Sequence, residues 1–179
     1  MAEKCECPPE AGSETCEPTS ARPSVACPAC ARPGKTVGAL TLKAMLAHPL
    51  TELREVEYRF CRTPECSTVY YSADGEQQFL ERDIREHVHN KHPDDDSVFV
   101  CYCFRHTPES IEKELATTGR STVVAAITAG IQAGQCACDI RNPQGSCCLG
   151  NVRAVVNRAE AAGSARQDAE NKLSFSPTT

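Results

Sequence analysis

Apolar and polar positions divide the chain into two structured regions, separated by a polar segment at residues 91–97. Before this segment, β-branched and aromatic residues concentrate at 57–60 and 67–72, which predicts two short strands. A third short strand is expected at Gly34–Val37, followed by a short helix over Thr41–Ala47. The first region is therefore predicted to be rich in β-structure.

After the polar segment, apolar residues recur at intervals of three and four, the period of an amphipathic helix. Thr107 and Pro108 suit the N-cap and first position of one helix, and Gly119 suits its end. Ser121 is expected to cap a second helix, which Gly134 ends. The apolar stripes of the three predicted helices are Ile111 and Leu115; Val124, Ile127 and Ile131; and Leu149, Val152, Val155 and Val156.

These elements predict an α+β protein in which a small β-rich unit precedes a three-helix unit. The polar ends of the chain hold few large apolar residues and are expected to be disordered. Residues 81–90 fit either a helix or a strand, because Ile84 and Val88 share a face in both. The predicted order is a cysteine-containing tail (1–26), a β-rich unit (27–90), a linker (91–97), a helical unit (98–162) and a second tail (163–179).

The composition indicates that metal, rather than a large core, stabilises these units. The 179 residues include 13 cysteines and no tryptophan, and only 5% are aromatic. The opening MAEKCECPPE lacks the apolar segment of a secretory signal, and no apolar run approaches membrane-spanning length. We therefore expect a cytoplasmic protein without membrane insertion, in which clustered cysteines bind metal more readily than they form disulfides. The net charge of −5 argues against nucleic acid as a partner.

The first cysteine group combines Cys27-x2-Cys30 with Cys61-x4-Cys66. Two short cysteine turns about thirty residues apart supply the four thiolates of a tetrahedral zinc site. Such a site is coordinatively full, so we expect it to stabilise the β-rich unit and to carry no catalysis. The alternative is an apolar hairpin with spare thiols.

The second cysteine group brackets the first two predicted helices. Cys101 and Cys103 precede them, and four more cysteines follow them: Cys136, Cys138, Cys147 and Cys148. Backbone N–H groups at helix starts are free to donate to anionic sulfur, as iron–sulfur clusters require. Asn142-Pro143-x-Gly145 is typical of a tight turn that folds the later cysteines back. The group therefore suits an iron–sulfur cluster, while a second zinc ion or two disulfides are the alternatives.

The motifs in both groups resemble one known family. The segments VCYCF…HTPxxI and CACDIRNPQGSCCLGNV resemble the N-terminal domain of CopZ-type copper chaperones and the bacterioferritin-associated-ferredoxin-like group. CPxC and YRFCxxPxCSTVYY resemble the zinc-binding part of the same chaperones. The resemblance covers residues 26–157 and implies a 2Fe–2S cluster in the helical unit and zinc in the β-rich unit.

The resemblance also implies which cysteines hold the cluster. Cys101 and Cys103 match the first two ligands, and Cys138 and Cys148 are taken as the other two. Cys136 and Cys147 remain alternates, and the choice between Cys136 and Cys138 is nearly even.

The resemblance implies a metal-binding redox protein that supports the handling of copper or another soft metal by one-electron transfer. Its partners would be metal ions and a copper transporter or a separate copper chaperone. Full-length chaperones of this kind carry a further copper-binding domain with a C-x-x-C motif, and the sequence after residue 162 holds no such motif. We expect no enzyme in the usual sense, beyond an ancillary metal-ion reductase activity.

Two other functions remain open. Thiols outside the assigned sites could make the protein a Cu(I) or Hg(II) binding or trafficking protein: Cys5, Cys7, Cys16, Cys136 and Cys147. A zinc-only interaction module is the second alternative. His87, His89 and His92 lie close together in the sequence, but their polar surroundings indicate solvated surface more than a metal site.

Overall fold

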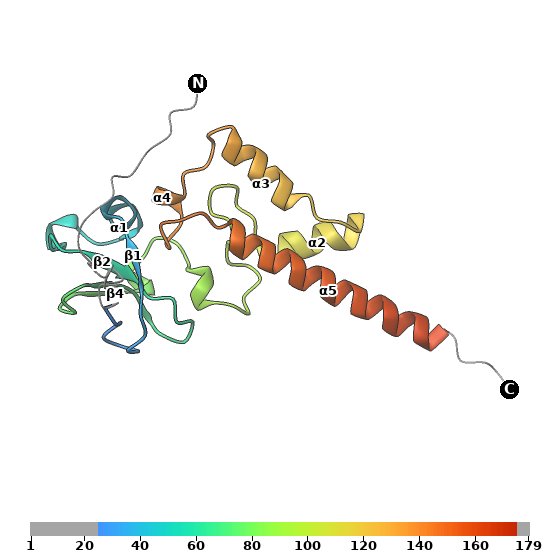
Figure 1. The fold of residues 1–179 in the computed structure, drawn as a ribbon, viewed down its shortest axis with the longest axis horizontal. Coiled ribbons are helices and arrows are strands. Elements are labelled where there is room, and N and C mark those ends of the chain that lie inside the picture. Colours follow the sequence, from blue (N-terminus) through green and yellow to red (C-terminus); the bar gives the residue numbers. More distant parts are fainter. Residues whose placement is uncertain (1–24, 175–179) are drawn as a thin grey trace, which may run out of the picture.

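The first part of the protein is a small antiparallel sheet (Figure 1). The computed structural model describes residues 25–174, with side chains described as far as residue 165. The tail cysteines Cys5, Cys7 and Cys16 lie outside the described residues. The strands follow one another in chain order across the sheet: β1 (Lys35–Val37), β2 (Tyr58–Phe60), β3 (Thr68–Ser72) and β4 (Gln78–Leu80).

The central strand β3 divides the sheet unit into two packed faces. Every residue of β3 is buried, and successive side chains of a strand point to opposite faces. Tyr70 packs with Leu42 and Phe60 in the main core, which the helix α1 (Ala39–Met45) covers. Tyr71 packs instead with a group of cysteines on the other face. The sheet therefore separates an ordinary apolar core from a sulfur-rich cluster.

The ambiguous stretch after β4 forms two short 3₁₀ turns, η2 (Glu81–Asp83) and η3 (His89–Lys91). Between them, Ile84 pairs with Leu46 at the end of α1. This segment is neither a helix nor a regular strand, since its backbone pairs with the end of α1 instead of extending the sheet.

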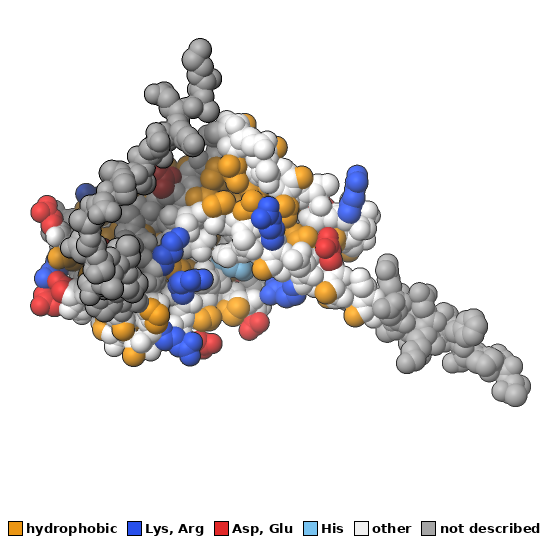
Figure 2. Space-filling model, viewed as in Figure 1, with side chains coloured by type: hydrophobic (Ala, Val, Ile, Leu, Met, Phe, Trp, Pro, Cys, Tyr) orange, Lys and Arg blue, Asp and Glu red, His pale blue; other side chains and the backbone are white. Residues whose placement is uncertain are grey.

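The second part of the protein consists of helices α2 (Pro108–Thr118), α3 (Val123–Gln132), α4 (Cys138–Arg141) and α5 (Leu149–Ser174). Both α2 and α3 lie against α5, and their apolar stripes meet in one core (Figure 1). The predicted three helices are present, with the four-residue α4 inserted in the cysteine-rich loop. Hydrophobic side chains also gather on the surface between α4 and α3 (Figure 2). No helix in the described range is long and apolar enough to cross a membrane.

The helix ends match the sequence in most places. Thr107 caps α2 by accepting from the N–H of Ser110, and Gly119 ends it in the left-handed conformation, with φ 73°. The N-cap of α3 is Thr122 rather than the predicted Ser121, whose hydroxyl accepts from the N–H of Val123.

The last helix extends beyond the predicted boundary of the helical unit. Residue 162 falls inside α5, whose 26 residues continue to Ser174. The segment after residue 157 is rich in alanine, arginine and glutamate, which are strong helix formers. Helix propensity therefore prolongs α5 past its apolar stripe, where a disordered tail had been expected.

The two parts contact each other through α1 and α4 (Figure 1). The Tyr70 hydroxyl, buried in the sheet unit, donates to the Pro143 carbonyl at 2.6 Å. Gly145 ends the turn that starts at Asn142, with its N–H donating to the Asn142 carbonyl at 2.8 Å. A Cβ at Gly145 would lie 2.9 Å from the hydroxyl of Thr41 on α1, so glycine permits the close approach. The predicted tight turn is thus also a point of contact between the two parts.

Substitution Tyr70→Phe tests this contact. The change removes the hydroxyl and leaves the buried Pro143 carbonyl without its partner. We expect the free energy of unfolding to fall by about 1–3 kcal/mol, the usual cost of an unsatisfied buried acceptor. Chemical denaturation of the metal-loaded protein measures this difference, and an unchanged value would show that the hydrogen bond contributes nothing to stability.

A carboxylate on α2 caps the start of α3. Glu114 accepts from the N–H of Thr122 at 3.1 Å and from the hydroxyl of Ser121 at 2.9 Å. Hydrogen bonds from Thr122, which outweigh burial, hold the pKa of Glu114 below its usual value. A carboxyl pKa that folding lowers adds stability above its unfolded pKa, and that stability is lost as the pH falls through its folded pKa.

We expect Glu114→Ala to destabilise the helical unit by about 1 kcal/mol at neutral pH, as loss of a helix cap does. The difference should shrink in acid, where the wild-type carboxylate is protonated. Denaturation curves at both pH values measure it. Glu112→Ala is the matched control, because Glu112 lies on the same helix and takes no part in this cap. An equal loss in both variants would contradict a capping role.

Candidate metal centres

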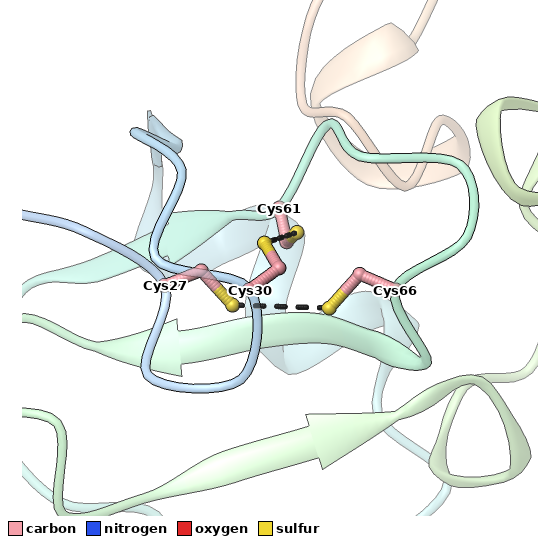
Figure 3. Close-up of side chains that lie close together, drawn as sticks. All are labelled: Cys27, Cys30, Cys61 and Cys66. Atoms are coloured by element: carbon pink, nitrogen blue, oxygen red, sulfur yellow. Dashed lines mark hydrogen bonds between the residues drawn. The ribbon is translucent and has the colours of Figure 1, made fainter.

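The first candidate centre lies on the sheet face that carries Tyr71 (Figure 3). Cys27 and Cys30 come from a tight turn, closed by the N–H of Ala31 donating to the Cys27 carbonyl at 2.7 Å. Cys61 and Cys66 come from the loop between β2 and β3. The two turns face each other, so all four predicted zinc ligands meet.

The sulfur positions fit one tetrahedral metal ion. The Sγ atoms of Cys27 and Cys66 are 3.9 Å apart, and those of Cys30 and Cys61 are 3.7 Å apart. All four Sγ atoms lie within 4.8 Å of one another. A zinc ion with Zn–S bonds of about 2.3 Å and tetrahedral angles requires sulfurs about 3.8 Å apart. The distances therefore match a four-thiolate zinc site.

The surroundings of this centre suit thiolates. Burial raises the pKa of Cys27 to about 12, although the N–H groups of Cys30 and Ala29 oppose the change. At Cys30, burial is outweighed by hydrogen bonds with the Thr63 hydroxyl and the Arg32 N–H, and the pKa falls to about 6. Metal binding deprotonates cysteine ligands, so these N–H groups would stabilise the bound form.

Two supporting residues of this centre, Lys91 and Tyr71, could not be predicted from the sequence. The ammonium of Lys91 donates to the Thr63 carbonyl at 2.7 Å and places a positive charge near Cys61. Tyr71 accepts from the N–H of Gly34 and donates to the Val25 carbonyl, which ties the first cysteine turn to the sheet. Lys91 lies far from both turns in the sequence, and no motif marks it.

The second candidate centre lies between the start of α2 and the start of α5. Cys101 bridges His106 across a tight turn, in which Arg105 takes the left-handed conformation with φ 57°. Cys103 leaves the same turn, and its Sγ lies 3.7 Å from that of Cys138 at the start of α4. The N–H of Ala137 donates to the Cys103 sulfur at 3.4 Å.

Cys101 and Cys148 form a second, more buried pair of thiols in this centre. Cys148 directly precedes α5, and both residues are almost fully buried in the helical core. The contact with Cys148 and the N–H groups of Phe104 and Cys103 together outweigh burial and lower the pKa of Cys101 to about 6. The same contact and burial raise the pKa of Cys148.

The two alternate cluster ligands, Cys136 and Cys147, differ in position. The Sγ of Cys136 lies 3.3 Å from that of Cys138, and the sulfurs of Cys103, Cys136 and Cys138 lie within 4.8 Å of one another. Cys147 is exposed, unlike its neighbour Cys148. Cys136 therefore belongs to the second centre in space, whereas Cys147 is the one thiol of this group on the surface of the described structure.

Comparisons with known proteins support the first centre directly. Residues 24–85 match the family model zf_CopZ, which is described as a zinc binding domain. This segment contains both cysteine turns, so the first part of the chain is similar to a zinc-binding domain in the residues that would hold the metal.

The particular likeness is to a CopZ protein. The fold matches the X-ray structure of the Archaeoglobus fulgidus CopZ N-terminal domain with a TM-score of 0.61 and 25% sequence identity. The match covers 73% of this chain and 96% of that domain. No curated protein matches the chain. The resemblance predicted from the sequence is confirmed for the zinc-binding part and for the CopZ-like fold.

Proposed function

We propose that this chain is a metal-binding redox protein that carries a structural zinc ion and a 2Fe–2S cluster. Zinc would be held by Cys27, Cys30, Cys61 and Cys66, and the cluster by Cys101, Cys103, Cys138 and Cys148. Its task would be to support the handling of copper, or of another soft metal, by one-electron transfer. The observation that carries the proposal is the convergence of two separate cysteine groups on two centres.

The chemistry of the second group fits an iron–sulfur cluster. The four chosen thiols form two close pairs, and tetrahedral iron with Fe–S bonds near those of zinc holds two thiolates at about the observed 3.7 Å. Backbone N–H groups face the sulfurs of Cys101 and Cys103, as cluster thiolates require. A bound 2Fe–2S cluster supplies reversible one-electron transfer, at a potential set by such hydrogen bonds and by solvent exposure.

Burial favours Cys138 and Cys148 over the alternates. Both belong to the apolar core of the helical part, while Cys136 only packs against it and Cys147 is exposed. The backbone N–H of Cys148 also opposes the rise that burial causes in the pKa of Cys138. Three of the four chosen ligands are buried and Cys103 is half-buried, so this set would shield most of the cluster from water.

The protein would act as a carrier rather than as an enzyme, with metal-ion reduction as an ancillary activity. Cu²⁺ and Cu⁺ differ by one electron, which matches what a single cluster can give. Partners would be metal ions and a copper transporter or separate copper chaperone in the cytoplasm, whose reducing conditions keep the ten described cysteines as thiols.

Anaerobic reduction of Cu²⁺ tests this function. The reduced, metal-loaded protein should convert Cu²⁺ to Cu⁺, trapped by a Cu⁺-specific chelator, faster than the double variant Cys101→Ser, Cys103→Ser. Cys147→Ser is the matched control, because it removes one exposed thiol and leaves both centres intact. Equal rates for the wild-type protein and the double variant would exclude the redox function.

One observation favours a second function, soft-metal binding. Three sulfurs of the second centre lie within 4.8 Å of one another: those of Cys103, Cys136 and Cys138. A group of three thiolates suits Cu(I) or Hg(II). Under this alternative, Cys136→Ser would weaken Cu(I) binding measured by competition with a chelator. Under the redox function, the same variant would keep its iron and its reductase rate.

A further inference from the structure

The short turns between the sheet and the helices bring together three residues with metal-binding side chains. Glu81 is the first residue of η2, and His92 directly follows η3. His87 lies between these turns. Each of the three offers one ligand atom, and these atoms lie within 4.8 Å of one another.

The contacts within this group are close. The Nε2 of His92 lies 2.7 Å from Oε2 of Glu81, and the Nδ1 of His87 lies 3.7 Å from Oε1 of the same carboxylate. The two imidazole rings stand edge to face, with centroids 5.8 Å apart. The carboxylate of Glu81 therefore faces two imidazoles. A simple surface ion pair would involve only one imidazole.

Hydrogen bonds hold the backbone around the group in place before any metal ion binds at this group. The N–H of Val88 donates to Glu81 Oε1 at 2.8 Å, and the Tyr102 hydroxyl donates to the His87 carbonyl at 2.8 Å. Lys91, next to His92, is tied to the loop of the first metal centre through the Thr63 carbonyl. These hydrogen bonds reduce the reorganisation that metal binding would require.

The group is also open to solvent, as an exchangeable site must be. The side chain of His87 is 80% exposed and that of His92 is 35% exposed, while Glu81 is 24% exposed. The two cysteine centres are more buried, so this group lies outside them in both chemistry and access.

We propose that Glu81, His87 and His92 form a third metal site, which binds a divalent transition metal of borderline softness such as Zn²⁺ or Cu²⁺. Two imidazole nitrogens and one carboxylate oxygen are a ligand set that both ions accept, and three protein ligands leave one position open. A metal ion would bind between the Nε2 of His92 and the carboxylate of Glu81, which now face each other at 2.7 Å. Metal binding at this site requires no change in the zinc or iron at the cysteine centres. The proposal is therefore independent of the proposed redox function.

Histidine-selective NMR with Zn²⁺ as the probe tests this site on the full chain already loaded at its cysteine centres. The chain has only five histidines, so each imidazole can be followed by ¹⁵N labelling. We expect the imidazole signals of His87 and His92 to shift together and to saturate along one common binding curve. His48 is an internal control, because its Nε2 pairs with Asp83 at 2.9 Å without a second histidine. Thiols elsewhere in the chain do not contribute to this readout.

Substitution of the exposed ligand separates the site from a plain ion pair. His87→Ala should weaken Zn²⁺ binding at His92 about tenfold or more, because it removes a ligand, and loss of a residue that only hydrogen-bonds to a ligand already costs about tenfold. Glu81→Gln, which keeps the side-chain shape, should weaken it as well. Unchanged His92 shifts in His87→Ala, or no saturable shift in the wild-type protein at millimolar Zn²⁺, would overturn the proposal. So would equal shifts at His48.

Discussion

Loss of zinc is expected to unfold the sheet part of the protein. Three of its four strands have only three residues, and the face around Tyr71 is packed mainly with cysteines. Zinc binding to four thiolates contributes about 10–16 kcal/mol of apparent free energy in small zinc domains, which equals or exceeds the net stability of an ordinary domain. Without the metal, we expect the remaining core around Leu42 and Phe60 not to hold the sheet by itself.

The variant Cys61→Ser tests this expectation, because Cys61 is fully buried and directly follows the last residue of β2 in the candidate zinc site. Metal analysis should show the loss of one zinc, and NMR spectra should lose the dispersed amide signals of residues 25–85. Cys147→Ser removes an exposed thiol of the same kind and should retain both. A folded, zinc-free Cys61→Ser protein would show that the metal is not what stabilises the sheet.

The second large effect is expected at neighbouring cysteines of the other centre. Cys148→Ser should abolish iron binding, whereas Cys147→Ser should leave it unchanged, although the two residues are adjacent in the sequence. The reason is position: Cys148 lies in the helical core against Cys101, and Cys147 faces solvent. Iron and sulfide content, with the visible absorption of the purified protein, measures this difference.

The pair Cys136 and Cys138 gives a more demanding test of which cysteines hold the cluster. Their sulfurs are only 3.3 Å apart, so one could replace the other with a small shift. Burial predicts that Cys138→Ser loses the cluster or binds it weakly, while Cys136→Ser keeps it. The reverse result would assign Cys136 as the ligand and would contradict the proposed set.

The sequence predicted the elements that have strong local signals. The aromatic and β-branched run in β3, the Thr107-Pro108 start of α2 and the turn that ends at Gly145 all appear in the structure. The meeting of the four zinc-site cysteines was also foreseen, because ligand number and spacing constrain such a site strongly.

Other features depend on contacts between distant residues and left no local signal. The strand β4 has three residues and exists through its pairing with β3, and the four-residue α4 is similarly short. The grouping of His87 and His92 with Glu81 arises because the backbone turns twice between them, so a polar sequence conceals a compact cluster. The sequence places Cys103 and Cys138 in one group, and the packing of the two helices between them brings their sulfurs to 3.7 Å from each other.

The most direct test of the two-centre assignment is combined metal analysis and low-temperature EPR on protein purified without air. Our assignment predicts one zinc, two irons and two sulfides for each chain, with an EPR signal that appears only after one-electron reduction. A colourless protein that contains zinc alone would contradict it. The cysteines from Cys101 to Cys148 would then be a thiol site for soft metals, and the proposed electron transfer would be excluded.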